Sequence, residues 1–358
     1  MSAEIKRLYG VERFNVDWRE LDLRIAVVGT GVAGAYLLNR IPAEHEVEAF
    51  EMRTEKNWYT VCAWGTSEPF ISDLVKKAGF NFQDYVLHRG KEMLVELGDG
   101  ELKINLKGLV TYDKHKLTED MLKGKKVHFG EQVKEANGNF KDFDMVIDAT
   151  GLHRSLLPKI QDDLVIPSLE YQVKSKELPY DDFVIKPYPG LAGYWWYFPL
   201  GDGLAHVGAG DLKGRYRGEL DEFVKKYHCE VVRRIGRPVR VTPPKYCEPF
   251  FEGKVWGVGE SIGTVYPMLG EGIIPSMQCV NIFVDHIGDK EGYRKAVLEQ
   301  FEVYAKVYKF IRAKVEDKFS LMRMWPTLLS IFWYMRSNEK RYGLETRMSD
   351  FYKIATRL

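Results

Sequence analysis

Three glycine-rich turns stand out among the residues whose types and spacing could do chemistry. The first, Gly29-Thr30-Gly31-Val32-Ala33-Gly34, has the G-x-G-x-x-G spacing. Its glycines allow a tight turn, a close approach of the backbone to a pyrophosphate, and close packing of a helix on a strand. Free N–H groups at the start of that helix would face the phosphates. Glu51 ends the next expected strand, where an acid can accept hydrogen bonds from ribose hydroxyls.

Residues near this motif add to the expected contacts with a dinucleotide. Arg53 lies two positions after Glu51 and is either a second nucleotide contact or a solvated charge. A structural alternative for the whole motif is a glycine-rich turn beside a surface glutamate. We expect the cofactor to contact Gly29, Gly31, Val32, Ala33, Gly34, Glu51, Met52 and Arg53.

The two later turns favour FAD over NAD as the dinucleotide. One ends an apolar strand at Ala149-Thr150-Gly151, and the other runs from Gly257 to Gly263 and leads to Gly270-Glu271-Gly272. A helix beginning after Gly272 would aim its N-terminus at the flavin ring and stabilise the negative charge of the reduced form. The expected contacts in these turns are Ala149, Thr150, Gly151, Gly259, Glu260, Gly270, Gly272 and Ile273.

Short apolar runs predict the strands that must position these turns. Residues 23–28, 47–51, 143–149 and 254–258 are runs of this kind and are typical of buried parallel strands. Residues 32–41 and 272–287 have helical spacing. The first unit is therefore β–turn–α–β, as in mononucleotide-binding folds. Residues 165–245 alternate strands and turns, and the pattern after 290 is helical, aromatic and basic.

The sequence resembles the flavoproteins related to p-hydroxybenzoate hydroxylase, and among them the archaeal geranylgeranyl reductase family. The resemblance covers residues 22–290 and rests on VVGTGVAG with Glu51, VCAWG around Cys62, VIDATG followed by Arg154, GVGESIGTVYPMLGEGI, and YWWYFP. The last segment, Tyr194 to Pro199, resembles the Y-x-W-x-F-P motif of those reductases. The chain departs from the family pattern at Glu260, which replaces an aspartate, at Trp64 in the Cys62 loop, and at Tyr112-Asp113-Lys114, where an arginine is common.

The resemblance implies an α/β fold. A Rossmann-type FAD-binding domain would carry an inserted antiparallel-sheet substrate domain and be followed by a C-terminal helical segment. The implied boundaries are 22–66, 98–164 and 245–290 for the FAD-binding domain, 67–97 and 165–244 for the substrate domain, and 291–358 for the helical region.

The resemblance also implies hydride transfer from reduced FAD to a carbon–carbon double bond of a prenyl-chain lipid, in an apolar tunnel. An external donor, a ferredoxin or a reduced pyridine nucleotide, would restore the electrons. We expect Cys62, Tyr194 and Trp196 to be catalytic. The Cys62 thiol would lie beside the flavin and give a proton or tune the ring, unless it is a small buried packing residue. A flavin-dependent monooxygenase or halogenase, or an electron-transfer flavoprotein, is the alternative.

Composition and charge argue against several other classes of function and site. The 358 residues carry 52 Lys and Arg against 51 Asp and Glu, which argues against a nucleic-acid partner. The four cysteines, Cys62, Cys229, Cys247 and Cys279, have no metal-site spacing, and we expect no metal. Residues 1–21 form a polar lead-in without the apolar core of a signal peptide, so a cytoplasmic location is expected.

The C-terminal segment differs in charge from the rest of the chain. Residues 301–358 contain 12 Lys and Arg but six Asp and Glu, mixed with many aromatic residues. This mixture is typical either of helices that cap a domain with a solvated basic face, or of an interfacial patch on a membrane. Peripheral membrane contact is therefore expected as a possible property of this segment.

Overall fold

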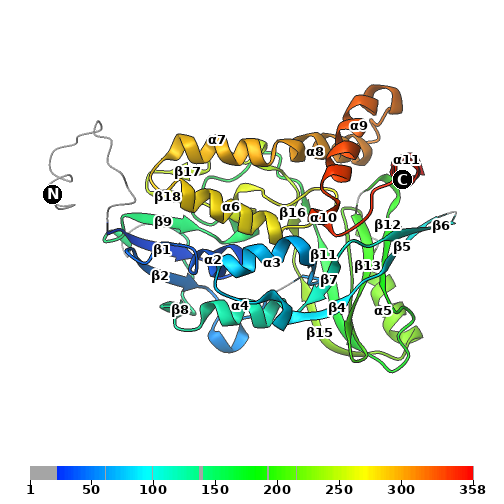
Figure 1. The fold of residues 1–358 in the computed structure, drawn as a ribbon, viewed down its shortest axis with the longest axis horizontal. Coiled ribbons are helices and arrows are strands. Elements are labelled where there is room, and N and C mark those ends of the chain that lie inside the picture. Colours follow the sequence, from blue (N-terminus) through cyan, green and yellow to red (C-terminus); the bar gives the residue numbers. More distant parts are fainter. Residues whose placement is uncertain are drawn as a thin grey trace.

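A computed structural model describes residues 22–60, 62–98, 100–136, 140–191, 193–214 and 216–357. The polar lead-in at 1–21, and with it the expected lack of a signal peptide, lies outside the described residues. Within them, two large sheets stand side by side, with helices against both (Figure 1). This arrangement confirms the predicted α/β class.

The first sheet is parallel apart from one edge strand. The sheet order is β17 (Phe251–Glu252), β18 (Val255–Gly257), β9 (Met145–Asp148), β1 (Arg24–Val28), β2 (Glu46–Glu51) and β8 (Val127–Phe129). In the central strand β1, Val27 pairs with Ala49 on one side and Ile147 on the other. All three side chains are fully buried, as expected for a parallel strand covered on both faces.

Helices cover the parallel sheet and bury its apolar face. They are α2 (Val32–Leu37), α3 (Glu68–Lys77), α4 (Lys114–Leu122) and α6 (Ile273–Asp285). Figure 1 shows α2 and α6 beside the parallel strands, with α3 next to α6 on the side toward the second sheet. The predicted helix at 272–287 is confirmed, whereas the helix predicted at 32–41 ends at Leu37 and continues only as turns.

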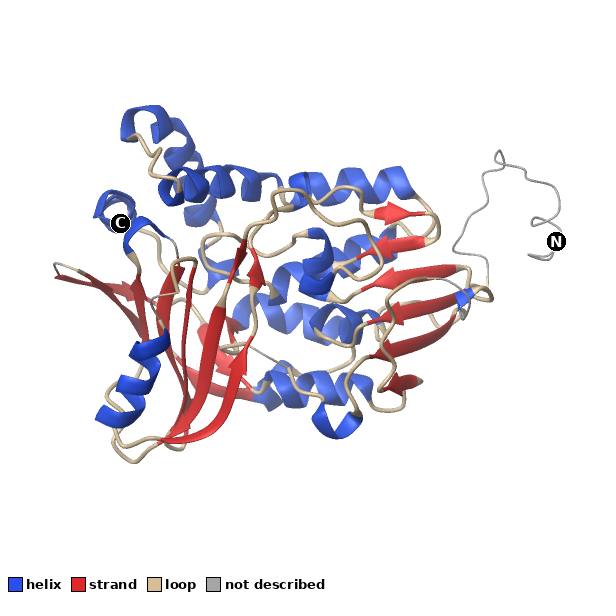
Figure 2. Ribbon diagram, turned by 180° about the vertical axis from the view of Figure 1, so that it is seen from behind, coloured by secondary structure: helices blue, strands red, loops and turns tan. Residues whose placement is uncertain are grey.

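The second sheet is antiparallel except where β12 pairs with β5. Its order is β15 (Glu230–Gly236), β11 (Ser168–Lys174), β14 (Leu204–Asp211), β13 (Gly193–Gly201), β12 (Phe183–Pro187), β5 (Glu92–Leu97) and β6 (Gly100–Asn105). Helix α5 (Arg217–Lys226) packs on its outer face (Figure 2), where Trp195 and Tyr197 meet Phe223. The opposite face is turned toward the parallel sheet.

The predicted boundary at residue 98 falls inside a hairpin of this second sheet. Strands β5 and β6 pair from Glu92 with Asn105 to Leu97 with Gly100, so residues 100–105 belong with the antiparallel sheet. Helix α3, expected in the substrate domain, instead packs its apolar side chains into the core of the parallel-sheet layer. Two small sheets contain the other described strands. One has the order β3 (Gly65–Ser67), β7 (Leu109–Tyr112) and β4 (Val86–Arg89), and the other pairs β10 (Val165–Ile166) with β16 (Val239–Arg240).

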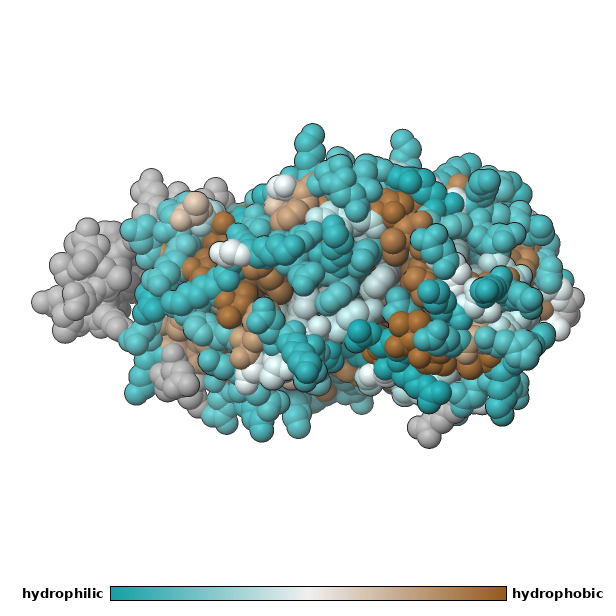
Figure 3. All heavy atoms as spheres, turned by 90° about the horizontal axis from the view of Figure 1, so that it is seen from below, coloured by the Kyte–Doolittle hydropathy of each residue, from teal (hydrophilic) through white to brown (hydrophobic). Residues whose placement is uncertain are grey.

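The described chain ends in the predicted helical region. Its helices are α7 (Lys290–Gln300), α8 (Glu302–Val315), α9 (Leu321–Ser337), α10 (Glu339–Tyr342) and α11 (Met348–Arg357). Over the described residues, no helix combines the length and apolarity that crossing a bilayer requires. The face seen from below in Figure 3 is mostly hydrophilic, with apolar side chains in smaller patches.

Candidate cofactor and substrate site

The turns at the carboxyl ends of β1, β9 and β18 meet at one edge of the parallel sheet. A Cβ added to Gly29 would lie 2.6 Å from the Ala149 carbonyl oxygen, and one added to Gly259 would lie 2.9 Å from the Cβ of Ala33. A Cβ on Gly34 would lie 1.9 Å from the Gly29 carbonyl oxygen. These positions admit no side chain, so the glycines allow the three sequence motifs to pack together.

Gly31 differs from its neighbours because it faces open space. A Cβ added there would have no atom within 4 Å, and helix α2 begins at this point without a side-chain cap. The first N–H groups of a helix have no partner within it. The residues present therefore fit the phosphates of a dinucleotide, which need a close backbone approach and N–H donors.

Glu51 lies at the end of β2 with its carboxylate held above the first turn. Its Oε2 accepts hydrogen bonds from the Thr30 hydroxyl (2.8 Å) and the Thr30 N–H (3.1 Å). Its Oε1 accepts the Arg53 N–H (3.0 Å). The Arg53 guanidinium donates to the Tyr59 carbonyl instead of standing free in solvent, and Met52 is 44% exposed. Glu51 is thus fixed in orientation, as a ribose-binding carboxylate requires.

Glu260 in the third turn contacts the antiparallel domain. Its Oε1 accepts the Arg240 N–H (3.0 Å), and its Oε2 lies 3.6 Å from the Arg237 guanidinium. The Arg237 side chain is 40% exposed, and both groups lie against Gly151. This places the longer acid, which departs from the family pattern, at the junction of the second and third turns. Arg237, a cation at that junction, has no motif around it and was not singled out from the sequence.

Two buried charged residues hold the second turn in place. The fully buried Asp148 accepts hydrogen bonds from the Thr150 hydroxyl (2.6 Å) and the Leu156 N–H (2.9 Å). Arg154 is 4% exposed and has a left-handed backbone. Its guanidinium donates to three main-chain carbonyls, those of Pro158, Pro249 and Ser261. Both residues therefore act by positioning the turns.

The start of α6 carries an ion pair that the sequence did not suggest. Gly272 is the N-cap, and helix α6 begins at Ile273. The Glu271 carboxylate accepts the Ile274 N–H (3.0 Å) and pairs with the Arg341 guanidinium of α10 at 2.5 Å. An acid at a helix N-terminus offsets part of the helix dipole, and the buried arginine offsets the acid in turn.

The antiparallel sheet presents aromatic side chains to these turns. Tyr194, Trp196 and Phe198 alternate along β13 with Trp195 and Tyr197, which pack against α5. The Tyr194 hydroxyl donates to the Leu269 carbonyl at 2.5 Å and lies beside Gly270. This packing gives the strand two distinct faces, one against α5 and one toward the turns.

Trp196 reaches across a neighbouring strand to a buried acid. A Cβ on Gly208 of β14 would lie 2.3 Å from the Trp196 ring, so only glycine leaves room for the indole there. The indole N–H then donates to Oε2 of Glu170 on β11 at 3.2 Å. Strand pairing places Glu170 opposite Gly208 and Gly208 opposite Trp196, which puts all three on one face.

Glu170 and His206 form a buried pair without full hydrogen bonding. His206 Nδ1 lies 3.5 Å from Glu170 Oε1, and the two side chains are 1% and 5% exposed. The contact falls short of hydrogen-bond geometry, and Glu170 Oε1 has no other partner. The His206 ring, in contrast, lies within hydrogen-bonding reach of the main chain at Cys62 and Ala63.

Burial keeps this pair uncharged. Desolvation raises the pKa of Glu170 to about 8, although the Trp196 hydrogen bond and the Lys114 charge act to lower it. Desolvation also lowers the pKa of His206 to about 3. At pH 7 the pair is therefore a carboxylic acid beside a neutral imidazole, and not an ion pair.

The Cys62 loop lies over the same face. The Trp64 ring packs on His206 with ring centres 4.7 Å apart, and the Trp64 main-chain N–H donates to the Cys62 sulfur at 3.4 Å. Cys62 and Trp64 both have positive φ angles, 150° and 62°, which L-residues rarely adopt. Burial raises the pKa of Tyr194, and the nearby Cys62 and Glu271 charges act in the same direction. Cys62, Tyr194 and Trp196 are thus brought together.

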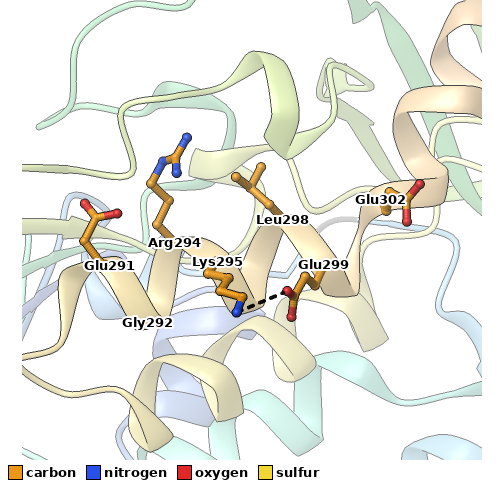
Figure 4. A pocket seen from close by; sticks show the side chains of 7 residues that line it. All are labelled: Glu291, Gly292, Arg294, Lys295, Leu298, Glu299 and Glu302. Carbon is orange, nitrogen blue, oxygen red and sulfur yellow. Dashed lines mark ion pairs between the residues drawn. The ribbon is translucent and has the colours of Figure 1, made fainter.

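Two buried cysteines pack in the core, where the Cys279 sulfur accepts the Gly259 N–H of the third turn (3.3 Å). Cys247 and Cys279 are buried, and desolvation raises the pKa values of their thiols to about 12 and about 11, as packing residues require. Among the described residues, no group of His, Cys, Asp and Glu could hold a metal ion. A hollow on α7 lies between Glu291 and Glu302, where Lys295 and Glu299 are 3.9 Å apart (Figure 4). None of the predicted site residues lines this hollow.

Sequence comparison gives one informative relative. No known protein-family model matches the chain. An uncharacterised protein of Methanocaldococcus jannaschii is 25% identical over 295 residues, which cover 70% of this chain and 80% of that protein.

Solved structures of flavoproteins share the fold. A geranylgeranyl bacteriochlorophyll reductase-like protein from Thermoplasma acidophilum has a TM-score of 0.65 at 15% identity, over 88% of this chain and 98% of that one. A probable FAD-dependent monooxygenase from Pseudomonas aeruginosa has a TM-score of 0.59 at 14% identity, over 85% and 99%. A tryptophan 6-halogenase from Streptomyces toxytricini has a TM-score of 0.61 at 15% identity, over 80% and 77%. The predicted resemblance is confirmed at the level of the fold.

Proposed function

We propose that the chain is an FAD-dependent oxidoreductase that reduces a carbon–carbon double bond of a prenyl-chain lipid. The observation that carries the proposal is the buried carboxyl group of Glu170, which the Trp196 indole N–H contacts on an aromatic face beside the Cys62 loop. An isolated alkene is not polarised. Its reduction therefore needs a hydride equivalent at one carbon, a proton at the other, and exclusion of water.

FAD is the cofactor that the three turns fit. The open space at Gly31 and the start of α2 would bind the pyrophosphate, and Glu51 would bind a ribose. Arg237 lies where a further phosphate or ribityl contact is possible. Reduced FAD, when bound, supplies two electrons and one hydrogen to the alkene. An external donor, a ferredoxin or a reduced pyridine nucleotide, returns those electrons.

The chain's own residues would hold and deliver the proton. Glu170 keeps its proton at pH 7, and loss of that proton to the second alkene carbon leaves a carboxylate at which the Trp196 indole N–H is directed. Solvent then restores the proton. The Cys62 thiol is the other candidate donor. Tyr194, Trp196 and Phe198 would orient the apolar chain and exclude water.

Cofactor binding is tested first, by absorbance after reconstitution with FAD. Gly31→Ala is expected to fold normally, because its Cβ meets no atom within 4 Å, and to weaken FAD binding by blocking the pyrophosphate. Gly218→Ala is the matched control, since a Cβ there also meets nothing within 4 Å. A wild-type protein that binds no FAD, or a Gly31→Ala variant with unchanged affinity, would contradict the assignment.

Turnover is then tested under anaerobic conditions. Dithionite-reduced protein is mixed with a geranylgeranyl lipid, and mass spectrometry follows the gain of two hydrogens per reduced bond. Glu170→Gln should abolish this gain if Glu170 supplies the proton, whereas Cys62→Ala should do so if the thiol does. Unchanged lipid, together with oxygen consumption and a hydroxylated product when a reduced pyridine nucleotide is added, would favour a monooxygenase instead.

A further inference from the structure

Helix α9 is apolar on the face turned to solvent as well as on the face turned to protein. Leu328 and Ile331 are buried, whereas Met322 is 90% exposed and Trp333 is 61% exposed. At 3.6 residues per turn, Met322, Trp325 and Trp333 lie within an arc of about 80°. A helix on the surface of a soluble domain normally has a polar outer face. The outer face of α9 therefore has the composition of a contact surface.

Helix α11 extends this apolar face. Met348 and Tyr352 are four residues apart on one side of α11, and they are 38% and 46% exposed. The rings of Tyr352 and Trp325 lie 6.4 Å apart, and a shallow hollow between the two helices is lined by Leu321, Met322, Trp325 and Tyr352. The α9–α11 face is defined here as Met322, Trp325, Trp333, Met348 and Tyr352.

This face gathers most of the large apolar side chains that the described structure exposes. Nine such side chains are exposed across the described residues, and five of them belong to the α9–α11 face. The other four, Met52, Leu87, Val232 and Tyr246, lie on separate elements. Scattered exposure of single apolar residues needs no explanation, but such a cluster does.

The surroundings of the face are cationic. Residues 318–357 contain eight Lys and Arg but three Asp and Glu, which gives a formal charge of +5. Arg323 and Lys353 stand next to Met322 and Tyr352, and both are exposed. In the described structure neither forms an ion pair, which leaves two cations at the edge of the face available to a negatively charged partner.

We propose that the α9–α11 face binds the surface of an anionic lipid bilayer. Trp and Tyr are favoured at the boundary between headgroups and acyl chains, and nearby Lys and Arg are attracted to anionic headgroups. A second copy of the chain fits the face less well, because pairing would bring two segments of +5 together. The proposal does not rest on the proposed reaction, since vesicle binding requires neither cofactor nor substrate.

Cosedimentation of the full chain with vesicles tests the proposal. The protein should bind vesicles of phosphatidylcholine with phosphatidylglycerol, bind weakly to phosphatidylcholine alone, and be released by high salt. Met322→Ser with Trp333→Ser should weaken binding to the anionic vesicles at least tenfold. Leu87→Ser with Val232→Ser is the matched control, because these residues are 41% and 49% exposed outside the face, and its binding should be unchanged.

A charge variant keeps the test independent of apolar substitutions in α9. Arg323→Glu with Lys353→Glu alters two exposed side chains that form no ion pair, and it should weaken anionic vesicle binding while leaving the circular dichroism spectrum unchanged. The proposal is overturned if wild-type protein does not bind anionic vesicles, or if the Met322/Trp333 and Arg323/Lys353 variants both bind as wild type does. Concentration-dependent dimerisation that disappears in the Met322/Trp333 variant, without vesicle binding, would assign the face to a second copy.

Discussion

Replacement of Glu170 by glutamine is expected to stabilise the folded protein, and to do so increasingly as the pH rises. Burial raises the pKa of Glu170 from 4.5 to about 8, so the folded state keeps a proton that the unfolded chain releases above pH 4.5. The Glu170 contribution to wild-type stability is therefore lost as the pH rises from 4.5 toward 8. Glutamine cannot ionise, and the variant should gain roughly 3 kcal/mol over wild type by pH 7, at 1.36 kcal/mol per pH unit.

The titration of His206 overlaps this pH window but is common to both proteins. Burial lowers the pKa of His206 from 6.5 to about 3, so between these pH values only the unfolded chain binds the proton, and stability rises with pH. This contribution is the same in wild type and variant and cancels in their difference. Glutamine also keeps a carbonyl oxygen that can accept the Trp196 indole N–H, so the exchange preserves that hydrogen bond and nearly preserves the volume.

Urea unfolding of both proteins at pH 5, 6, 7 and 8 measures the effect. The difference in unfolding free energy should be near zero close to pH 4.5 and grow with pH. Glu48→Gln is the control of opposite sign, because burial acts to raise the pKa of Glu48 but hydrogen bonds from Lys126 and His128 lower it overall. That variant should lose stability, most at neutral pH. A Glu170 difference that stays constant from pH 5 to pH 8 would refute the neutral-acid assignment.

Three further substitutions test the packing around the site. Gly208→Ala would put a Cβ 2.3 Å from the Trp196 ring, and denaturant unfolding should show a loss of about 1–3 kcal/mol from the displaced indole. Gly34→Ala would clash with a carbonyl at 1.9 Å, so soluble yield and thermal stability should both fall, unlike in Gly31→Ala. Arg341→Leu leaves the Glu271 carboxylate without its cation and should lower the free energy of unfolding by about 3–5 kcal/mol. The double variant Arg341→Leu, Glu271→Leu should regain much of this loss, which a double-mutant cycle measures.

The cofactor turns could be predicted because their chemistry is local. A glycine is required wherever a Cβ would strike the backbone, as at Gly29 and Gly34, and such positions leave fixed spacings in the sequence. Each turn also follows an apolar strand of a parallel sheet, whose carboxyl ends must meet at one edge. The glycine spacings and the topology of the parallel sheet therefore make the same prediction, namely that the three motifs lie close together.

Glu170 could not be found in the same way. It lies within a strand that alternates in an ordinary manner, and its partners Trp196 and His206 are 26 and 36 positions away on two other strands. Its neutrality comes from burial, which depends on how the sheet packs against the Cys62 loop. Only the register of the strand pairs shows that Gly208, which has no side chain, leaves room for the Trp196 indole. In the strand sequence SLEYQVK, Glu170 lies on the polar side of the alternation, where a solvated residue is expected, so nothing in the sequence signals its burial.

The C-terminal helices connect the α9–α11 face to the candidate site through a buried cluster. Tyr334 follows Trp333 in α9, and its hydroxyl contacts that of Tyr342 at 3.3 Å. The Tyr342 ring lies 4.9 Å from that of Tyr266, and the adjacent Arg341 pairs with Glu271 before α6. Rings and ion pairs packed in this way move together and not independently. A bilayer bound at α9 and α11 would therefore fix the orientation of the loop before α6, which is the loop that Tyr194 contacts from the substrate side.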